Sequence, residues 1–174
     1  MKNVENTRFE HICPGTEEAR LAERFLIRPA QPPRSLLPDE AWTKGDGALL
    51  VLQPDAGVAG VAGTGGIALG GGYLLGGWCS FRCQLAVPRR FAAREGERLA
   101  AGAPMDGILS GRLSDVLKAL LAQADCQPSA GASWLKMRLN HQLQAEARRE
   151  LMGLGWQVTH CRLEKILITR REAA

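Results

Sequence analysis

The last third of the chain, from Gly107 to Thr169, has an apolar spacing that switches between the period of a helix and that of a strand. Residues 112–124 are predicted to be an amphipathic helix because their apolar side chains recur at intervals of three, four and seven. That stripe consists of Leu113, Val116, Leu117, Leu120, Leu121 and Ala124. Residues 133–139 alternate between apolar and polar side chains instead, which predicts a strand.

The remainder of this third predicts one more helix and one more strand. A helix over 141–152 would bury Leu143, Ala147 and Leu151, and the glycines that follow suit its C-terminal cap. Residues 157–169 are predicted to be a closing β segment. The resulting order of elements favours the α/β (α+β) class, with a mixed, mostly antiparallel sheet flanked by helices.

The first third of the chain predicts a helix, a connection and a strand. Thr16 suits the cap of a short helix over 16–27, and residues 28–47 are predicted to be a connection because they contain four prolines. Residues 48–53 are predicted to be a buried strand that forms a hairpin with 58–62.

The middle of the chain is rich in glycine. Residues 57–77 hold ten of the twenty glycines, and they are predicted to be a flexible hairpin loop. Such a stretch could hold phosphate on its backbone amides, but no Gly-Lys-Ser/Thr sequence follows it. A strand over 78–87 is predicted next, and then an insertion over 89–109 that contains a helix over 90–100.

Size and charge are those of one globular domain spanning residues 1–174, with a net charge of +4. The second half, 88–174, carries a net +5, which suits nucleic acid, an acidic protein or a phosphorylated cofactor. Its basic residues are dispersed along the chain rather than gathered in a dense stripe, so solvated helix faces are favoured over a nucleic-acid surface.

The five cysteines are an odd and scattered set, which is typical of a reduced, cytoplasmic protein with free thiols. No secretory signal and no run of 18 apolar residues is present, so no membrane segment is expected. Cys79 and Cys83 are predicted to be small core residues on one side of a strand rather than zinc ligands, and no metal site is expected. His141 and His160 are expected to be surface or half-buried histidines, although a general base is an alternative.

The order of elements resembles the Gcn5-related N-acetyltransferase (GNAT) fold over roughly residues 48–169. The best local match is at the last helix, where the family's pattern of Asn, Ala, Tyr and Gly-Phe falls on Gln144, Ala147, Leu151 and Gly155-Trp156. Leu85-Ala86-Val87-Pro88 resembles the end of the family's fourth strand. The acyl-homoserine-lactone synthases, which share this fold and often carry Gly-Trp, are a possible variant.

The resemblance implies that the chain binds acyl-CoA. The backbone of Leu85, Ala86 and Val87 would then pair with the pantetheine arm. Ser110, Gly111 and Arg112 would lie at a helix start that holds the pyrophosphate, and Gln144 would complete the site. Leu151 stands where the family has its general-acid tyrosine, so no catalytic residue is assigned.

Three functions follow from these patterns. The first is transfer of an acyl group from a CoA or carrier-protein thioester to a small amine. The second is a non-catalytic relative, a binding or accessory protein that has lost the cofactor loop. The third is a basic nucleic-acid-binding module that uses the C-terminal half.

Overall fold

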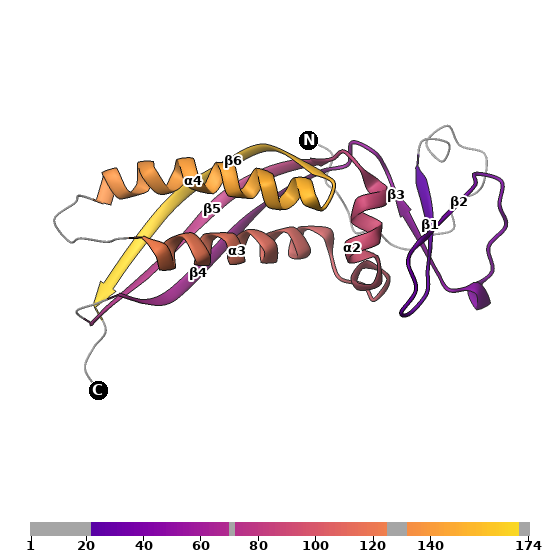
Figure 1. The fold of residues 1–174 in the computed structure, drawn as a ribbon, viewed down its shortest axis with the longest axis horizontal. Coiled ribbons are helices and arrows are strands. Elements are labelled where there is room, and N and C mark those ends of the chain that lie inside the picture. Colours follow the sequence, from indigo (N-terminus) through magenta and orange to yellow (C-terminus); the bar gives the residue numbers. More distant parts are fainter. Residues whose placement is uncertain (1–21, 70–71, 125–131, 171–174) are drawn as a thin grey trace.

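A computed structural model describes residues 22–69, 72–124 and 132–170. These residues form two three-stranded antiparallel sheets and the helices that pack on them (Figure 1). In the part of the chain that the structure describes, no helix combines the length and the apolar character needed to cross a membrane.

The larger sheet is built from three long strands in the order β4-β5-β6. The strands are β4 (Gly57–Leu69), β5 (Tyr73–Leu85) and β6 (Trp156–Arg170). Alternate side chains of β5, among them Cys79, Phe81 and Leu85, are buried on one face, as expected for a sheet covered on one side. The residues between them point to the opposite face.

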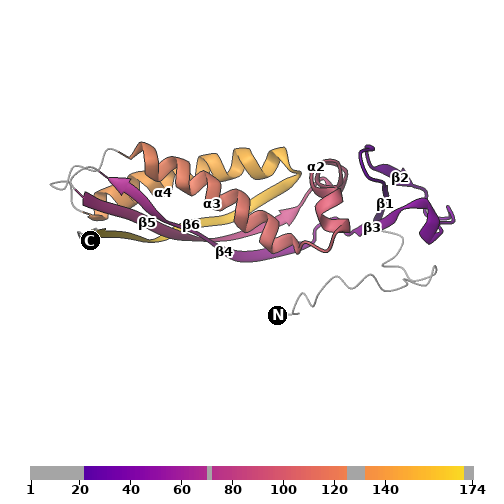
Figure 2. The same cartoon turned by 90° about the horizontal axis from the view of Figure 1, so that it is seen from below.

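Two helices cover that buried face, as the second view of the fold shows (Figure 2). They are α3 (Met105–Gln123) and α4 (Ala132–Gly153). Each buries a stripe of residues spaced by four, which on a helix places them on one side. The stripes are Leu109, Leu113, Leu117 and Leu121 from α3, and Leu135, Leu139, Leu143, Ala147 and Leu151 from α4.

The smaller sheet lies at one end of the molecule, in the order β2-β1-β3 (Figure 1). Its strands are β1 (Glu23–Ile27), β2 (Arg34–Leu36) and β3 (Ala48–Leu52), with a 3-10 turn at Lys44–Asp46. Helix α2 (Pro88–Ala100) packs on β1 and β3 and links the two sheets. Gly96 allows this close packing, because a Cβ there would lie 2.9 Å from the Ile27 side chain.

The mixed α/β class with antiparallel strands and flanking helices is confirmed, although the strands form two sheets rather than one. The strands expected over 48–53, 78–87 and 157–169 are present. The helices expected over 90–100, 112–124 and 141–152 are also present, each beginning earlier in the chain.

The strand predicted over 133–139 is wrong, because these residues belong to α4. Leu135 and Leu139 are buried, whereas Met137 between them is 67 % exposed. The spacing that governs burial is therefore four rather than two, and the polar-apolar alternation seen in this short stretch is incidental to the helix.

Three other local predictions are also wrong. Most of the glycine-rich stretch 57–77 belongs to the paired strands β4 and β5 rather than to a loop, and residues 70–71 lie outside the described part of the chain. The strand over 48–53 pairs with β1, not with 58–62. Residues 23–27 of the helix predicted over 16–27 are strand β1, and residues 16–21 lie outside the described part of the chain. The segments named as a connection, 28–47, and as an insertion, 89–109, contain β2 and α2.

Candidate anion-binding groove

The residues predicted to start a phosphate-binding helix lie well inside α3. This helix begins at Met105 after Pro104, so the amides of Ser110, Gly111 and Arg112 fall beyond the unpaired first turn. The Ser110 hydroxyl donates to the carbonyl of Val61 at 3.1 Å and so fixes α3 to strand β4. The predicted helix start is therefore wrong, and these residues have no exposed row of amides.

Arg112 is occupied by an internal ion pair. Its Nη2 lies 2.5 Å from Oε1 of Glu95, which is only 1 % exposed, and its Nη1 lies 3.7 Å from Glu150. The hydrogen bond to Glu95 raises the pKa of Arg112 above its ordinary value. Arg98 binds the other oxygen of Glu95 at 2.9 Å. This cluster joins α2, α3 and α4, so Arg112 has a structural role.

The backbone at Leu85, Ala86 and Val87 is also fully engaged. Leu85 exchanges hydrogen bonds with the Asp55–Ala56 turn, while the amides of Ala86 and Val87 both donate to the carbonyl of Gly155 at 2.9 Å. Strand β5 is antiparallel to both of its neighbours, so the described residues hold no diverging parallel pair for a pantetheine arm.

Among the predicted site residues, Gln144 lines a groove whose side chains are not paired with one another, whereas Arg112 lines a second groove between α3 and α4. Gln144 is half-buried on α4, and its groove, of about 180 Å³, lies between this helix and β6. Asn140 and Arg148 line the same groove from α4, and residues 158–162 line it from β6. The structure does not bring Gln144 together with Ser110–Arg112, which form part of the contacts of α3 with β4 and α2.

A row of polar side chains on α4 faces the outer edge of β6 at every fourth residue. Lys136 Nζ donates to the carbonyl of Glu164 at 2.7 Å, and the amide of Leu163 donates to Oδ1 of Asn140 at 2.8 Å. These two side chains bind backbone groups that an edge strand otherwise leaves unpaired.

The next two members of that row, Gln144 and Arg148, lie where the groove opens. Within the described part of the chain, neither side chain has a hydrogen-bond partner. Strand β6 carries a bulge here, between its pairings at Val158 and His160. Bulges redirect neighbouring side chains, which is why they often occur beside functional sites.

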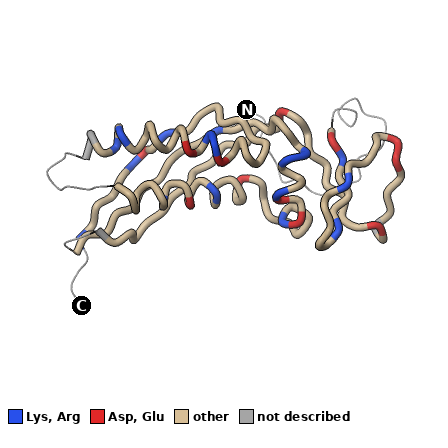
Figure 3. Tube along the Cα trace, viewed as in Figure 1, with Lys and Arg blue, Asp and Glu red and all other residues tan. Residues whose placement is uncertain are grey.

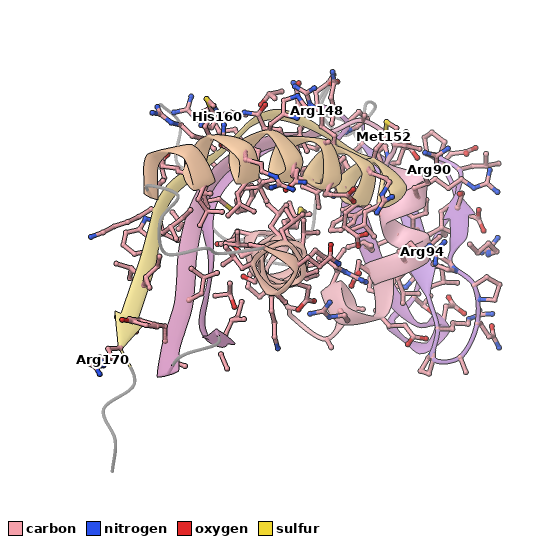
Figure 4. The ribbon with its side chains drawn as sticks, turned by 60° about the vertical axis from the view of Figure 1, so that its left-hand side comes forward. Arg90, Arg94, Arg148, Met152, His160 and Arg170 are labelled. Carbon is pink, nitrogen blue, oxygen red and sulfur yellow. The ribbon has the colours of Figure 1, made fainter. Side chains whose placement is uncertain are left out.

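The groove is basic. Arg148 lines it from α4, and His160 and Arg162 line it from β6, where the His160 ring also lies 3.4 Å from the Ser80 hydroxyl on the uncovered sheet face. Arg148 and His160 project on the same side of the molecule (Figure 4). None of the described residues that line the groove carries a carboxylate. Guanidinium and amide groups are donors suited to phosphate or carboxylate ligands.

The closest carboxylate on β6 belongs to Glu164. Its Oε1 accepts a hydrogen bond from the Ser80 hydroxyl at 2.6 Å, on the sheet face that the helices leave uncovered. This bond lowers the pKa of Glu164 below its ordinary value, and the charges of Arg162 and Lys136 act in the same direction. Glu164 is thus ionised and engaged at neutral pH.

A second groove, of about 380 Å³, lies between α3 and α4, but its charges satisfy one another. Arg149 pairs with Glu146 at 2.5 Å, and Arg112 with Glu150. Opposite charges held in this way leave no uniform field for a ligand.

Cys79, Cys83 and Cys161, the cysteines in the described part of the chain, are buried, as predicted for Cys79 and Cys83. Burial raises the pKa of Cys83 to about 12, which keeps its thiol protonated and unreactive. The described residues contain no group of His, Cys, Asp and Glu side chains that could hold a metal ion. His11 and Cys13, whose side chains are also of kinds that bind metals, lie outside the described residues.

No protein-family model matches this chain, and no curated protein matches it significantly. The groove must therefore be interpreted from its own chemistry. Sequence reasoning found Gln144 but missed Arg148, His160 and Arg162 as partners. The signal was the spacing of Lys136, Asn140, Gln144 and Arg148, which forms a row only when the helix begins before residue 136.

Proposed function

We propose that the chain is a non-catalytic binding protein that holds an anionic partner in the groove between α4 and β6. The observation that carries this proposal is the interrupted row on α4. Lys136 and Asn140 bind the edge of β6, whereas Gln144 and Arg148 have no partner among the described residues. A bound phosphate or carboxylate would complete the row.

Thermal shift with pyrophosphate tests this function. A ligand at 100 times its dissociation constant stabilises the folded state by about 2.7 kcal/mol, which raises the midpoint by roughly 5–10 °C in a chain of this size. Arg148→Gln should remove most of this shift. Arg149→Gln is the matched control, since it removes the same charge from the neighbouring position, where the side chain pairs with Glu146 outside the groove. If pyrophosphate raised the melting midpoint equally in the two variants, the proposal would be refuted.

Acyl transfer from a CoA thioester to a small amine is the second candidate, and it rests on the GNAT resemblance together with the place of Gln144 in the groove. Coenzyme A carries phosphates, so both functions predict that it binds. The two functions differ in what they predict for acetyl-CoA. Acyl transfer requires release of free CoA thiol when acetyl-CoA and an amine are added together, whereas binding alone releases none. A shift with acetyl-CoA no larger than that with CoA, and no thiol release, would leave only the binding function.

A further inference from the structure

The face of the large sheet opposite the two helices carries an exposed tryptophan at its centre. Trp78 lies on the middle strand β5, paired with Gly63 on one side and Lys165 on the other. Its side chain is 36 % exposed, and Lys165 Nζ lies 5.4 Å from the ring centroid. An exposed aromatic ring can stack on a planar group such as a nucleic-acid base.

The surroundings of Trp78 on this face are small. Gly63 pairs with it, and Gly76 precedes it by two residues on the same face. Neither glycine has a side chain that could cover the ring, and the group that lies over the indole is the ammonium of Lys165, which a stacking base would have to displace. Val61 and Leu167, which occupy diagonal positions on the same face, are also exposed.

Cationic side chains lie on the same face beside Trp78. Arg82 is opposite His160, and Arg162 is opposite Ser80, in the register of β5 with β6. His160 and Arg162 also line the groove, so the open face and the groove meet at the edge of β6. The carboxylate of Glu164 on this face accepts the hydrogen bond from Ser80.

Folding brings these cations together from distant parts of the sequence. Residues 56–81 carry no charge at all, and along the trace the basic residues lie on the small sheet and on α2, α3, α4 and β6 (Figure 3). Arg82, Arg148 and Arg162 are dispersed along the chain, and for that reason the sequence disfavoured a nucleic-acid surface. In the fold, Arg148 and Arg162 line the groove, and Arg82 and Arg162 lie on the sheet face that also carries Trp78.

We infer that this surface binds single-stranded nucleic acid, an inference that rests on the anion-binding function proposed above. A nucleotide chain offers phosphates to the groove and to Arg162, while the π-face of a base stacks on Trp78. Bases stack on an exposed aromatic ring only when they are not already stacked in a duplex, so a single strand is preferred. Basic side chains beside the ring then follow the backbone.

Fluorescence anisotropy with a labelled single-stranded RNA 12-mer tests the inference, with the matching DNA strand, its duplex, polyphosphate and anionic lipid vesicles as further arms. Trp78→Ala should weaken binding of the single strand roughly 5- to 150-fold, the range for loss of one stacked base. Trp78→Phe keeps a stacking ring and should stay within about threefold of the parent. Circular dichroism and the thermal midpoint establish that both variants are folded.

A salt titration measures the phosphate contacts separately. Arg148→Gln should reduce the slope of log K against log salt by about 0.7, the value for one contact with a single strand. Lys118→Gln serves as the control, because Lys118 is exposed on α3, away from both the groove and the open face. Its slope should equal that of the parent.

The outcomes separate the two proposals. The nucleic-acid inference would be overturned if Trp78→Ala left oligonucleotide binding unchanged. If Arg148→Gln weakened polyphosphate binding in the same experiments, the anion-binding groove would stand without it. Equal affinity for duplex and single strand, or binding to vesicles alone, would also overturn the nucleic-acid inference. No binding of any anion would refute the proposed function itself.

Discussion

The buried carboxylate of Glu95 gives the sharpest test of how the helices are held together. Glu95 is 1 % exposed and receives hydrogen bonds from Arg98 and Arg112, whose side chains are 58 % and 40 % exposed. Replacing it by glutamine keeps the shape but removes the charge. Both arginines can then be hydrated, so the loss is set by the charge-assisted hydrogen bonds, about 2 kcal/mol.

The opposite change should cost more. Arg112→Met leaves the carboxylate of Glu95 buried with only Arg98 beside it, and stranding a buried charge costs about 3 kcal/mol or more. In a chain of this size 1 kcal/mol moves the midpoint by roughly 2–4 °C, so Glu95→Gln should lower it by roughly 4–8 °C and Arg112→Met by more.

Urea denaturation monitored by circular dichroism measures both free energies of unfolding. Glu146→Gln is the matched control, because Glu146 forms an exposed pair with Arg149 on α4 and should lose less than about 1 kcal/mol. The reasoning fails if Glu95→Gln is no more destabilising than Glu146→Gln. It also fails if Arg112→Met proves the milder of the two changes within the cluster.

Two further predictions concern the backbone at Gly155 and the ionisation of Glu164. Gly155 has a φ of +89° and a Cβ there would collide with the carbonyl of Val87, so Gly155→Ala should cost more than about 2 kcal/mol in a thermal melt. Gly153→Ala, in helical backbone with open space around it, should be neutral or stabilising by up to about 1 kcal/mol, and similar losses at both sites would contradict the argument. Ser80→Ala should raise the pKa of Glu164, measured by carboxyl NMR titration, because the hydrogen bond that lowers it is gone. A carboxyl group whose pKa is lowered in the folded state stabilises the fold at neutral pH, and this stabilisation is lost as the pH falls below the ordinary value of 4.5. The free energy of unfolding should therefore decline less steeply at acid pH in Ser80→Ala than in the parent. An unchanged pKa of Glu164 in this variant would show that Ser80 does not cause the shift.

The sequence predicted elements well where one periodicity ran over many residues. The leucine stripe of α3 and the strand over 157–169 were of this kind. It failed over 133–139, because seven residues with Leu135, Met137 and Leu139 satisfy the period of a strand by chance. Only packing against the sheet decides that Leu135 and Leu139 face inward and Met137 outward.

The glycine-rich segment failed for another reason. Glycine has a low intrinsic preference for strands, so ten glycines within 57–77 predict a loop. Pairing of β4 with β5 overrides that preference, and Gly60 has a positive use, because a Cβ there would lie 2.8 Å from the ring of Phe81. The contact between Gly60 and Phe81 forms only when the two strands pair, so the sequence around Gly60 does not predict it.

The candidate site could be predicted only in part. Gln144 was found through a family resemblance, whereas Arg148 and His160 required the register of α4 against β6. The phosphate site predicted at Ser110, Gly111 and Arg112 was wrong for two reasons. The helix starts at Met105, and the carboxylate of Glu95, which is distant in the sequence, is buried beside Arg112.

The pairing of β5 with β6 also bears on how the protein is synthesised. Ser80 and His160, which lie across that pair, are 80 residues apart in the chain. During translation the β4–β5 hairpin therefore emerges well before the strand and helices that cover it. Its long uncharged stretch lacks the charges that discourage association between strand edges. Until β6 is synthesised, the unpaired edge of β5 is exposed in the nascent chain and is a binding site for chaperones.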